Sequence, residues 1–321
     1  MSFSYNVKSE LLHCFGEDEH CQIAEISAII NLCGQIVERE NKICVKIQTE
    51  NVIVARKLFT LIKKNFNIEC NITVRRNNQL KKNRVYILCV GDNKKRDVVE
   101  NFLKMCCVRQ EAGKYKLGYI DENVFSDVCC KRAYIRGAFL ACGSVNDPEK
   151  TYHMEFVVSS LECAESLMSA INSFGVDSKY ILRKEHYVIY VKEGEQIADI
   201  LNIIGAHVSL MKFENIRILK DMRNNVNRRV NCETDNLSKT INAAVKQIEE
   251  IEFIRDNYGL KYVPPMLYQA AEARLKYPDA SLKELGGKVT PPVGKSGMNH
   301  RLHKISEIAQ KLMKGMGKNY D

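Results

Sequence analysis

The sequence contains no long apolar run. No stretch approaches the roughly 18 apolar residues that span a bilayer, and residues 1–8 lack the apolar core of a signal peptide. A cytoplasmic protein without a membrane partner is therefore expected. The 321 residues suggest two or three domains, since a domain typically has about 100–200 residues.

Cys-x-x-Cys pairs are also absent, although the chain has 13 cysteines. The number is odd and most lie in apolar runs, as expected of cysteines that pack as small hydrophobic side chains in a reducing compartment. His13-Cys14 and His20-Cys21 carry the side chains that zinc prefers. Their spacing matches no common structural zinc site, so the sequence predicts no metal site and no cofactor.

Acidic residues are outnumbered. The chain has 39 Asp and Glu against 48 Lys and Arg, which gives a formal net charge of +9. Such an excess favours an anionic partner, either nucleic acid or a lipid surface. Many soluble proteins are mildly basic, so the charge alone does not identify the partner.

The chain resembles itself at an offset of 109 residues. Ile26–Gly34 aligns with Ile135–Gly143, and both segments end in Cys-Gly. The same offset pairs Ala55 with Ala164, Leu58 with Leu167 and Ile62 with Ile171. A constant offset over about forty residues indicates duplication.

Each copy shows the same pattern of elements, helix-strand-strand-helix-strand-strand-helix. The first helices end at Gly34 and Gly143, where glycine suits a left-handed cap. The later elements are predicted from apolar spacing. In the first copy they are 43–48, 52–65, 70–74, 85–90 and 95–105, and in the second 152–158, 161–174, 179–182, 187–191 and 195–204.

Small residues on the first helices, Ala28, Gly137 and Ala141, allow two helix backbones to approach closely. The predicted fold class is therefore α+β, a duplicated αββαββα domain with pseudo-twofold symmetry followed by an all-α domain. A duplicated fold without any implied function is the plainer interpretation of the same pattern. The predicted boundaries are 1–105, 106–218, a linker at 219–237, and 238–321.

The predicted linker is rich in Asn and Arg and has little apolar periodicity. Its residues Arg223, Arg228 and Arg229 are candidates for phosphate contacts. A solvated polar connection explains them equally well.

Four helices are expected after the linker. The first covers residues 238–256, with Ile241, Val245, Ile248 and Ile251 on one face, and the second covers 265–276. Ser281 and Glu284 form a capping box that opens a third, short helix. Pro291 and Pro292 end it, and a last helix begins near Lys295 with an apolar stripe at Met298, Leu302, Ile305, Ala309 and Leu312.

The start of the last helix has the character of a DNA-reading helix. Its polar face carries Lys295, Ser296, Asn299, His300, His303 and Lys304, with Arg301 on the flank. Arginine can pair with guanine and asparagine with adenine, whereas lysine suits phosphate. Residues 281–321 contain eight Lys or Arg against three acids, a net of about +5. A small helical bundle with an ordinary solvated face is the alternative.

A nucleotide-binding loop is excluded at this point. Gly294-Lys295-Ser296 resembles the end of a P-loop, but that motif needs a glycine where Val289 stands, and a strand before it. No small-molecule substrate is therefore expected.

The nine residues Ile135–Gly143 resemble the signature helix of the LAGLIDADG homing endonucleases. The resemblance implies that the residue before each final glycine would bind a divalent metal through a carboxylate. Cys33 and Cys142 stand there, and Asn31 and Leu140 at the other acidic position of the signature. Thiols are poor ligands for magnesium, so no catalytic site and no enzyme activity are expected; an active nuclease is the disfavoured alternative.

Four segments closely resemble the WhiA family of bacterial regulators. They are residues 2–11, 131–155, 225–234 and 281–311. The resemblance implies a degenerate LAGLIDADG domain tethered to a helix-turn-helix, and a role in transcription control linked to sporulation, cell division or chromosome segregation. It implies double-stranded DNA as a partner at the nucleoid, and makes RNA polymerase or another regulator a further candidate.

The N-terminal domain leaves one alternative open, a scaffold that binds a protein partner. Basic residues near its predicted sheets are either a remnant DNA surface or solubilising charge. They are Arg75, Arg76, Lys81, Lys82, Arg84 and Lys184.

Overall fold

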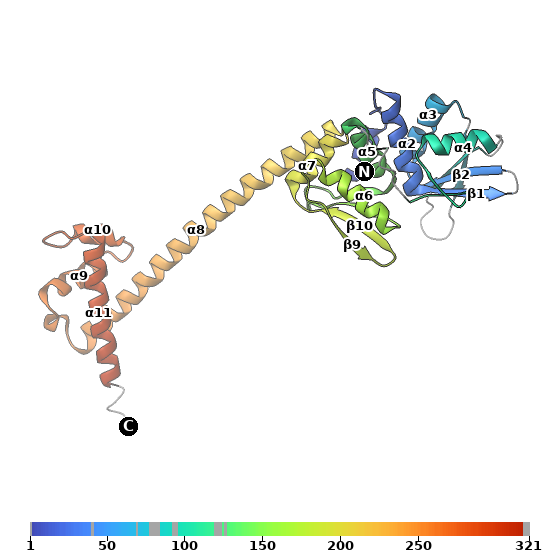
Figure 1. Cartoon of the computed structure of the whole chain (residues 1–321). Coiled ribbons are helices and arrows are strands. Elements are labelled where there is room, and N and C mark those ends of the chain that lie inside the picture. The colour runs from blue at the N-terminus through green and yellow to red at the C-terminus, as the bar shows by residue number, and fades with distance from the viewer. Residues whose placement is uncertain are drawn as a thin grey trace. The chain divides into compact units, whose positions relative to one another are not determined.

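The computed structural model describes residues 2–39, 42–68, 70–76, 84–91, 96–118, 124 and 127–316. The chain divides into two compact units, Met1–Lys220 and Asp221–Asp321. Figure 1 shows the elements of each unit.

The first unit contains the predicted αββαββα order twice. The first copy comprises α2 (Glu19–Cys33), β1 (Gly34–Arg39), β2 (Lys42–Thr49), α3 (Val52–Phe66), β3 (Cys70–Arg76), β4 (Arg84–Val90) and α4 (Arg96–Met105). The second comprises α5 (Val128–Cys142), β7 (Gly143–Val145), β8 (Met154–Val158), α6 (Leu161–Asn172), β9 (Lys179–Arg183), β10 (His186–Val191) and α7 (Gly194–Ile203). The antiparallel sheets have equivalent orders, β1-β2-β4-β3 and β7-β8-β10-β9. The predicted duplication is confirmed.

Two features of this unit have no counterpart among the predicted elements. Helix α1 (Phe3–Leu11) precedes the first copy and is capped by the Ser2 hydroxyl, which accepts from the amide of Tyr5. A short hairpin, β5 (Arg109–Glu111) and β6 (Lys114–Lys116), lies between the copies. The α1 helix buries Phe3, Val7 and Leu11 in the core of the unit, so it belongs to the domain.

Helices α2 and α5 pack closely against each other at the centre of the unit. A Cβ atom added at Gly137 would lie 2.5 Å from the carbonyl oxygen of Glu25 and 2.8 Å from Cβ of Ala28. Cys33 Sγ contacts the carbonyl oxygen of Ala141 at 3.5 Å. The predicted close approach of the two first helices is confirmed.

The glycines that end α2 and α5 are needed for a different reason from the predicted one. Gly34 has φ −83° and Gly143 φ −82°, so neither adopts the left-handed conformation. A Cβ at Gly34 would instead lie 2.3 Å from the carbonyl oxygen of Ile30, and one at Gly143 would lie 2.6 Å from Cα of Phe139. Glycine is required because the chain turns directly from helix into strand against the last helical turn.

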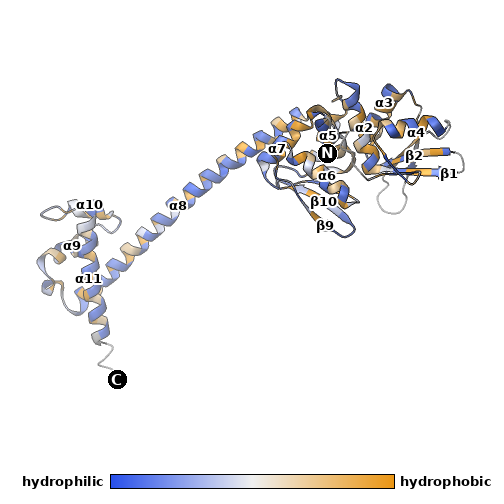
Figure 2. Ribbon diagram, viewed as in Figure 1, coloured by the Kyte–Doolittle hydropathy of each residue, from blue (hydrophilic) through white to orange (hydrophobic). Residues whose placement is uncertain are grey.

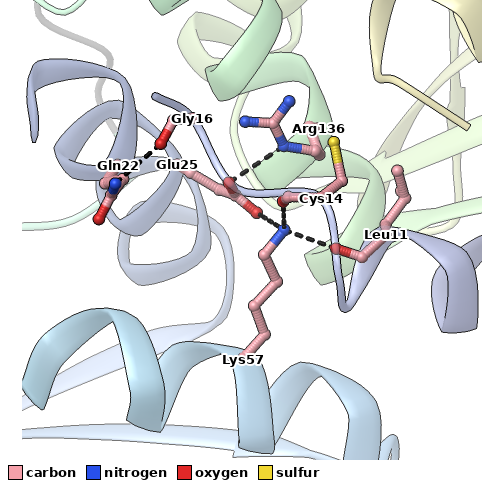
Figure 3. A network of polar contacts seen from close by, with 7 residues as sticks. All are labelled: Leu11, Cys14, Gly16, Gln22, Glu25, Lys57 and Arg136. Carbon is pink, nitrogen blue, oxygen red and sulfur yellow. Dashed lines mark hydrogen bonds and ion pairs between the residues drawn. The ribbon is translucent and has the colours of Figure 1, made fainter. Parts of the chain in front are cut away.

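A charged network is buried beside the central helices (Figure 3). Lys57 Nζ on α3 lies 2.5 Å from Glu25 Oε1 on α2, and neither side chain is exposed. Arg136 Nε on α5 donates to Glu25 Oε2 at 3.0 Å. Lys57 also donates to the carbonyl oxygens of Leu11 and Cys14, at 2.7 and 2.6 Å. The network connects three helices with the segment that follows α1.

The predicted linker is helical. Helix α8 runs from His207 to Asn257, and residues 219–237 are part of it, all of them exposed except the partly buried Lys220. The expected polar connection is exposed, but it is not separate from the helix expected to begin at residue 238, because that helix begins at His207. No glycine or proline interrupts 207–257, and pairs such as Arg229–Glu233, at 3.8 Å, support an exposed helix. Figure 2 shows mainly hydrophilic residues along the middle of α8 with scattered hydrophobic ones.

The second unit has its own core around the end of α8. That core combines Ile251 and Ile254 with residues of α9 (Pro265–Lys276), α10 (Leu282–Gly287) and α11 (Lys295–Met316), while η2 (Leu260–Tyr262) connects α8 to α9. Ile241 and Val245, predicted on one face with Ile251, are 52% and 49% exposed. Among the described residues, no helix combines the length and apolar character needed to cross a membrane.

Candidate DNA-binding surface

Helices α10 and α11 form a helix-turn-helix that begins at the predicted capping box. The Ser281 hydroxyl accepts from the amide of Glu284, and the Glu284 carboxylate accepts from the amide of Ser281 at 2.8 Å. These contacts fix the start of α10. They also hold the pKa of Glu284 below its usual value, because hydrogen bonds from Ser281 favour the ionised carboxyl.

The turn between the two helices folds back onto α10. The amide of Val293 donates to the carbonyl oxygen of Gly286 at 2.9 Å. A Cβ at Gly286 would lie 2.1 Å from the carbonyl oxygen of Val293, so only glycine permits this approach. Val289 is buried in the same core as Leu285. The turn therefore holds α10 and α11 in a defined relation.

Helix α11 is amphipathic, with an apolar face and a polar face. Met298, Leu302, Ile305 and Ala309 are buried in the core of the second unit, because helical residues three and four apart share a face. The opposite face carries six exposed side chains within about half a turn of one another: Lys295, Ser296, Asn299, His300, His303 and Lys304. His303 Nδ1 also lies 3.3 Å from Glu307 Oε1.

The expected position of Arg301 in the reading face is corrected by the structure. Arg301 lies on the other side of α11. It is 9% exposed, and its Nη1 atom has no hydrogen-bond partner among the described residues. Each residue turns a helix by about 100°, so Arg301 lies next to Met298 and far around the helix from Asn299. Applying that rotation to the sequence would have placed Arg301 beside the apolar stripe.

The three linker arginines are exposed on α8. At about 100° per residue, Arg223, Arg228 and Arg229 point in different directions around the helix. They lie about 33–42 Å along its axis from Ile251, at about 1.5 Å per residue. The structure therefore does not bring them together with the polar face of α11.

The sequence analysis did not identify two exposed lysines near the turn as candidates for DNA contacts. Lys283 lies on α10 and Lys288 in the turn that precedes α11. Lys288 Nζ lies 5.0 Å from the ring centroid of Tyr277. Their position next to and within the turn is the signal that could have identified them.

The metal position of the LAGLIDADG signature contains different chemistry. Cys142 Sγ contacts the carbonyl oxygen of Ala138 at 3.3 Å, and Lys8 Nζ donates to the carbonyl oxygen of Leu140 at 3.1 Å. Burial raises the pKa of the Cys33 thiol to about 11 and that of Cys142 still further. Burial also lowers the pKa of Lys8, and this effect exceeds the opposite effect of the neighbouring Cys142 and Cys33, which raise it. Neutral thiols beside an amine do not fit magnesium.

The structure describes some of the basic residues that the sequence placed near the sheets. Arg75 on β3, Arg84 on β4 and Lys184 between β9 and β10 are exposed. Lys81, Lys82 and the side chain of Arg76 lie outside the described residues.

Comparison with known proteins identifies the family. Residues 19–105 match the WhiA N-terminal LAGLIDADG-like domain, 131–223 the WhiA LAGLIDADG-like domain, and 226–309 the WhiA C-terminal HTH domain. The probable cell division protein WhiA of Alkaliphilus oremlandii is 50% identical over 323 residues, covering 99% of this chain and 100% of the relative. That of Thermoanaerobacter sp. strain X514 is 52% identical over 315 residues, covering 97% and 98%.

Solved structures show the same fold. The crystal structure of full-length WhiA from Thermotoga maritima has a TM-score of 0.60 and 24% identity, and covers 97% of this chain and 99% of that one. The N-terminal LAGLIDADG domain of a WhiA protein has a TM-score of 0.50 and 20% identity, covering 64% and 90%. With about half of its residues identical to curated relatives over nearly its whole length, this chain belongs to the WhiA family.

Proposed function

We propose that this WhiA-family DNA-binding protein is a sequence-specific transcription regulator that acts at the nucleoid in cell division, chromosome segregation or sporulation, without nuclease activity. The observation that carries the proposal is the polar face of α11. Asn299 and His300 are exposed there while Met298 and Leu302 hold the helix in the core. A recognition helix needs this division, because its free face must reach base edges.

The assignment of roles on this face follows from side-chain chemistry. Asn299 can pair with adenine through two hydrogen bonds. Lys295 and Lys304 suit phosphates, which set position rather than sequence. Ser296, His300 and His303 supply further polar contacts from the same face. Arg223, Arg228 and Arg229 remain candidates for phosphate contacts away from α11.

A matched pair of variants tests this proposal. We expect Asn299→Ala to weaken binding to a selected DNA site by about 1–3 kcal/mol, and to leave binding to random DNA unchanged. Gln310→Ala, an exposed residue farther along α11, is the control and should leave both unchanged. Binding would be measured by fluorescence anisotropy at several salt concentrations, after selection of the site from a random library. Equal site affinity of Asn299→Ala and the unmodified chain would contradict the assigned face.

The residues at the signature position support the proposed lack of nuclease activity. Cys33 and Cys142 are neutral, and Lys8 adds a basic group where a divalent cation would have to sit. Incubation of the chain with supercoiled DNA carrying the selected site, in magnesium and then in manganese, should give no cleavage. Site-specific cleavage that disappears with a chelator would contradict this part of the proposal.

A protein-binding role for the first unit is the second candidate function, and exposed apolar residues on its edge strands favour it. Ile72 and Val74 on β3 are 45% and 50% exposed, and Leu182 on β9 is 62% exposed. The partner would be RNA polymerase or another regulator. In the full chain, Arg75→Ala with Arg84→Ala should leave DNA affinity unchanged if this unit binds protein, and should lower it if the unit binds DNA.

A further inference from the structure

Four side chains with metal-binding chemistry meet where the two central helices begin. His20 and Cys21 lie in the first turn of α2, and Cys129 and Cys130 lie in the first turn of α5. One ligand atom from each residue lies within 4.8 Å of all the others. The pairs are separated by the 109-residue offset of the internal repeat, since His20 aligns with Cys129 and Cys21 with Cys130. The cluster therefore lies across the pseudo-twofold axis of the first unit.

The distances within the cluster are close to those of a metal site. His20 Nδ1 lies 3.1 Å from Cys130 Sγ and 3.5 Å from Cys21 Sγ. Tetrahedral zinc, with bonds of about 2.3 Å to sulfur and 2.0–2.1 Å to nitrogen, separates its ligand atoms by roughly 3.4–3.8 Å. Small side-chain movements are enough to adopt this geometry. Cys21 and Cys130 are buried while His20 and Cys129 are exposed, so an ion can enter from solvent.

A contact outside the cluster orients the histidine. The second ring nitrogen of His20, Nε2, lies 3.4 Å from Oδ2 of Asp18, the N-cap residue of α2. Histidines that bind metals usually donate their other ring N–H to a carboxylate or carbonyl, which fixes the tautomer. Asp18 therefore favours a proton on Nε2 and leaves the lone pair of Nδ1 directed at the thiols.

We propose that His20, Cys21, Cys129 and Cys130 bind one zinc ion, which ties the first repeat to the second. Three thiolates and one imidazole form a ligand set of structural zinc sites, and four protein ligands leave no open position for catalysis. The role is therefore mechanical, because the ion joins the starts of α2 and α5 independently of their packed middle sections.

This site is separate from the metal position of the LAGLIDADG signature. Cys33 and Cys142 lie at the opposite ends of the same helices, about 18 Å away at 1.5 Å per residue. It also differs from the set that the sequence suggested. His13 and Cys14 are not among the clustered residues, and the two missing ligands come from the second repeat.

Metal analysis of matched variants tests the proposal. The full chain would be produced with zinc and purified with a phosphine reductant. Inductively coupled plasma mass spectrometry should then find one zinc ion per molecule. Cys129→Ser should lose it, whereas Cys232→Ser, another exposed cysteine, should retain it. Cobalt added to the metal-free chain should give the intense visible bands of a tetrahedral thiolate site, and Cys129→Ser should lack them.

A second pair of variants leaves all four ligands in place. Asp18→Asn should weaken zinc binding by about 10–100-fold in competition with a chromogenic chelator, since it removes only the carboxylate behind His20. The control is Asp177→Asn, another exposed carboxylate, with its own partner Lys179 Nζ at 3.4 Å. It should leave zinc affinity unchanged.

Four results would overturn the proposal. One is a chain that takes up no zinc when zinc is in excess. The second is a Cys129→Ser variant that keeps the zinc content, the cobalt spectrum and the chelator competition of the unmodified chain while circular dichroism shows it folded. The third is iron in place of zinc in the purified protein. The fourth is a disulfide among these cysteines after purification in reductant.

Discussion

Lys57 forms a fully buried ion pair with Glu25, at 2.5 Å, in the interior of the first unit. Arg136 shares the same carboxylate, and the backbone oxygens of Leu11 and Cys14 accept the remaining protons of Lys57. A buried charge is tolerated only when it is paired and hydrogen-bonded. Helices α2, α3 and α5 must therefore be assembled together with the end of α1.

Removal of the lysine should destabilise the first unit strongly. Lys57→Met leaves two buried carbonyl oxygens without donors and weakens the neutralisation of Glu25. The expected loss is about 3–5 kcal/mol in the free energy of unfolding, measured with urea. Lys63→Met, an exposed lysine on the same helix, should change it by less than about 0.5 kcal/mol. Similar effects of the two substitutions would show that the buried pair does not contribute as described.

Enlargement of Gly137 should separate the central helices. In Gly137→Ala the new methyl group meets the Glu25 carbonyl and Ala28 at distances that no real contact allows. The expected cost is about 1–3 kcal/mol of stability, because backbone must move. Gly287→Ala has nothing within 4 Å and no positive φ, and should be tolerated. Unchanged thermal unfolding of Gly137→Ala would mean that α2 and α5 are farther apart.

The thiols at the signature position should react slowly and with a strong pH dependence. Burial raises the pKa of Cys33 from 9.0 to about 11. At about pH 8 such a thiol is ~0.1% ionised, whereas one with the ordinary pKa is roughly a tenth ionised. Alkylation of Cys33 by iodoacetamide should therefore be about 100-fold slower than that of exposed Cys232, and should rise about tenfold per pH unit. Peptide mass spectrometry over time measures both rates.

The same pKa shift has a consequence for stability. The folded chain holds the Cys33 proton more tightly than the unfolded chain, so the stabilisation is fully present below the ordinary pKa of 9.0 and is lost as pH rises through about 11. Cys33→Ala should flatten the decline of unfolding free energy over this window. An unchanged decline would assign the pH dependence to other groups.

Arg301 should matter to stability rather than to DNA reading. Its guanidinium is buried with one nitrogen unpartnered, and an apolar side chain of similar length removes that penalty. Arg301→Met should leave DNA affinity close to that of the unmodified chain, and should keep or raise the unfolding free energy of the second unit by about 1 kcal/mol. A loss of site affinity as large as that of Asn299→Ala would return Arg301 to the reading face.

Periodicity and repeats predict those parts of the fold that local chemistry decides. Helix α9 starts at Pro265 and ends at Lys276 as predicted, because proline suits a first turn. The duplicated elements were found within one or two residues of their observed bounds. The middle of α8 was misjudged because asparagine often favours turns. In this segment no glycine or proline ends the helix, so it continues.

The reading face of α11 is partly visible in the sequence. Six of its seven predicted residues are exposed on one side, since helical rotation alone separates them from the apolar stripe. The seventh, Arg301, follows the same rotation into the core. The basic residues of α10 and the turn were missed because their proximity to α11 depends on how the turn folds back.

The duplication, the order of the elements and the apolar stripe of α11 can be predicted from the amino-acid sequence, because each is a pattern along the chain. Which distant side chains meet depends instead on how the elements pack. Only the packing of α2 against α5 brings Cys129 and Cys130 to His20, and only the docking of α1 places Lys8 beside Cys142. These contacts join residues more than a hundred positions apart, and no local pattern encodes such a pairing.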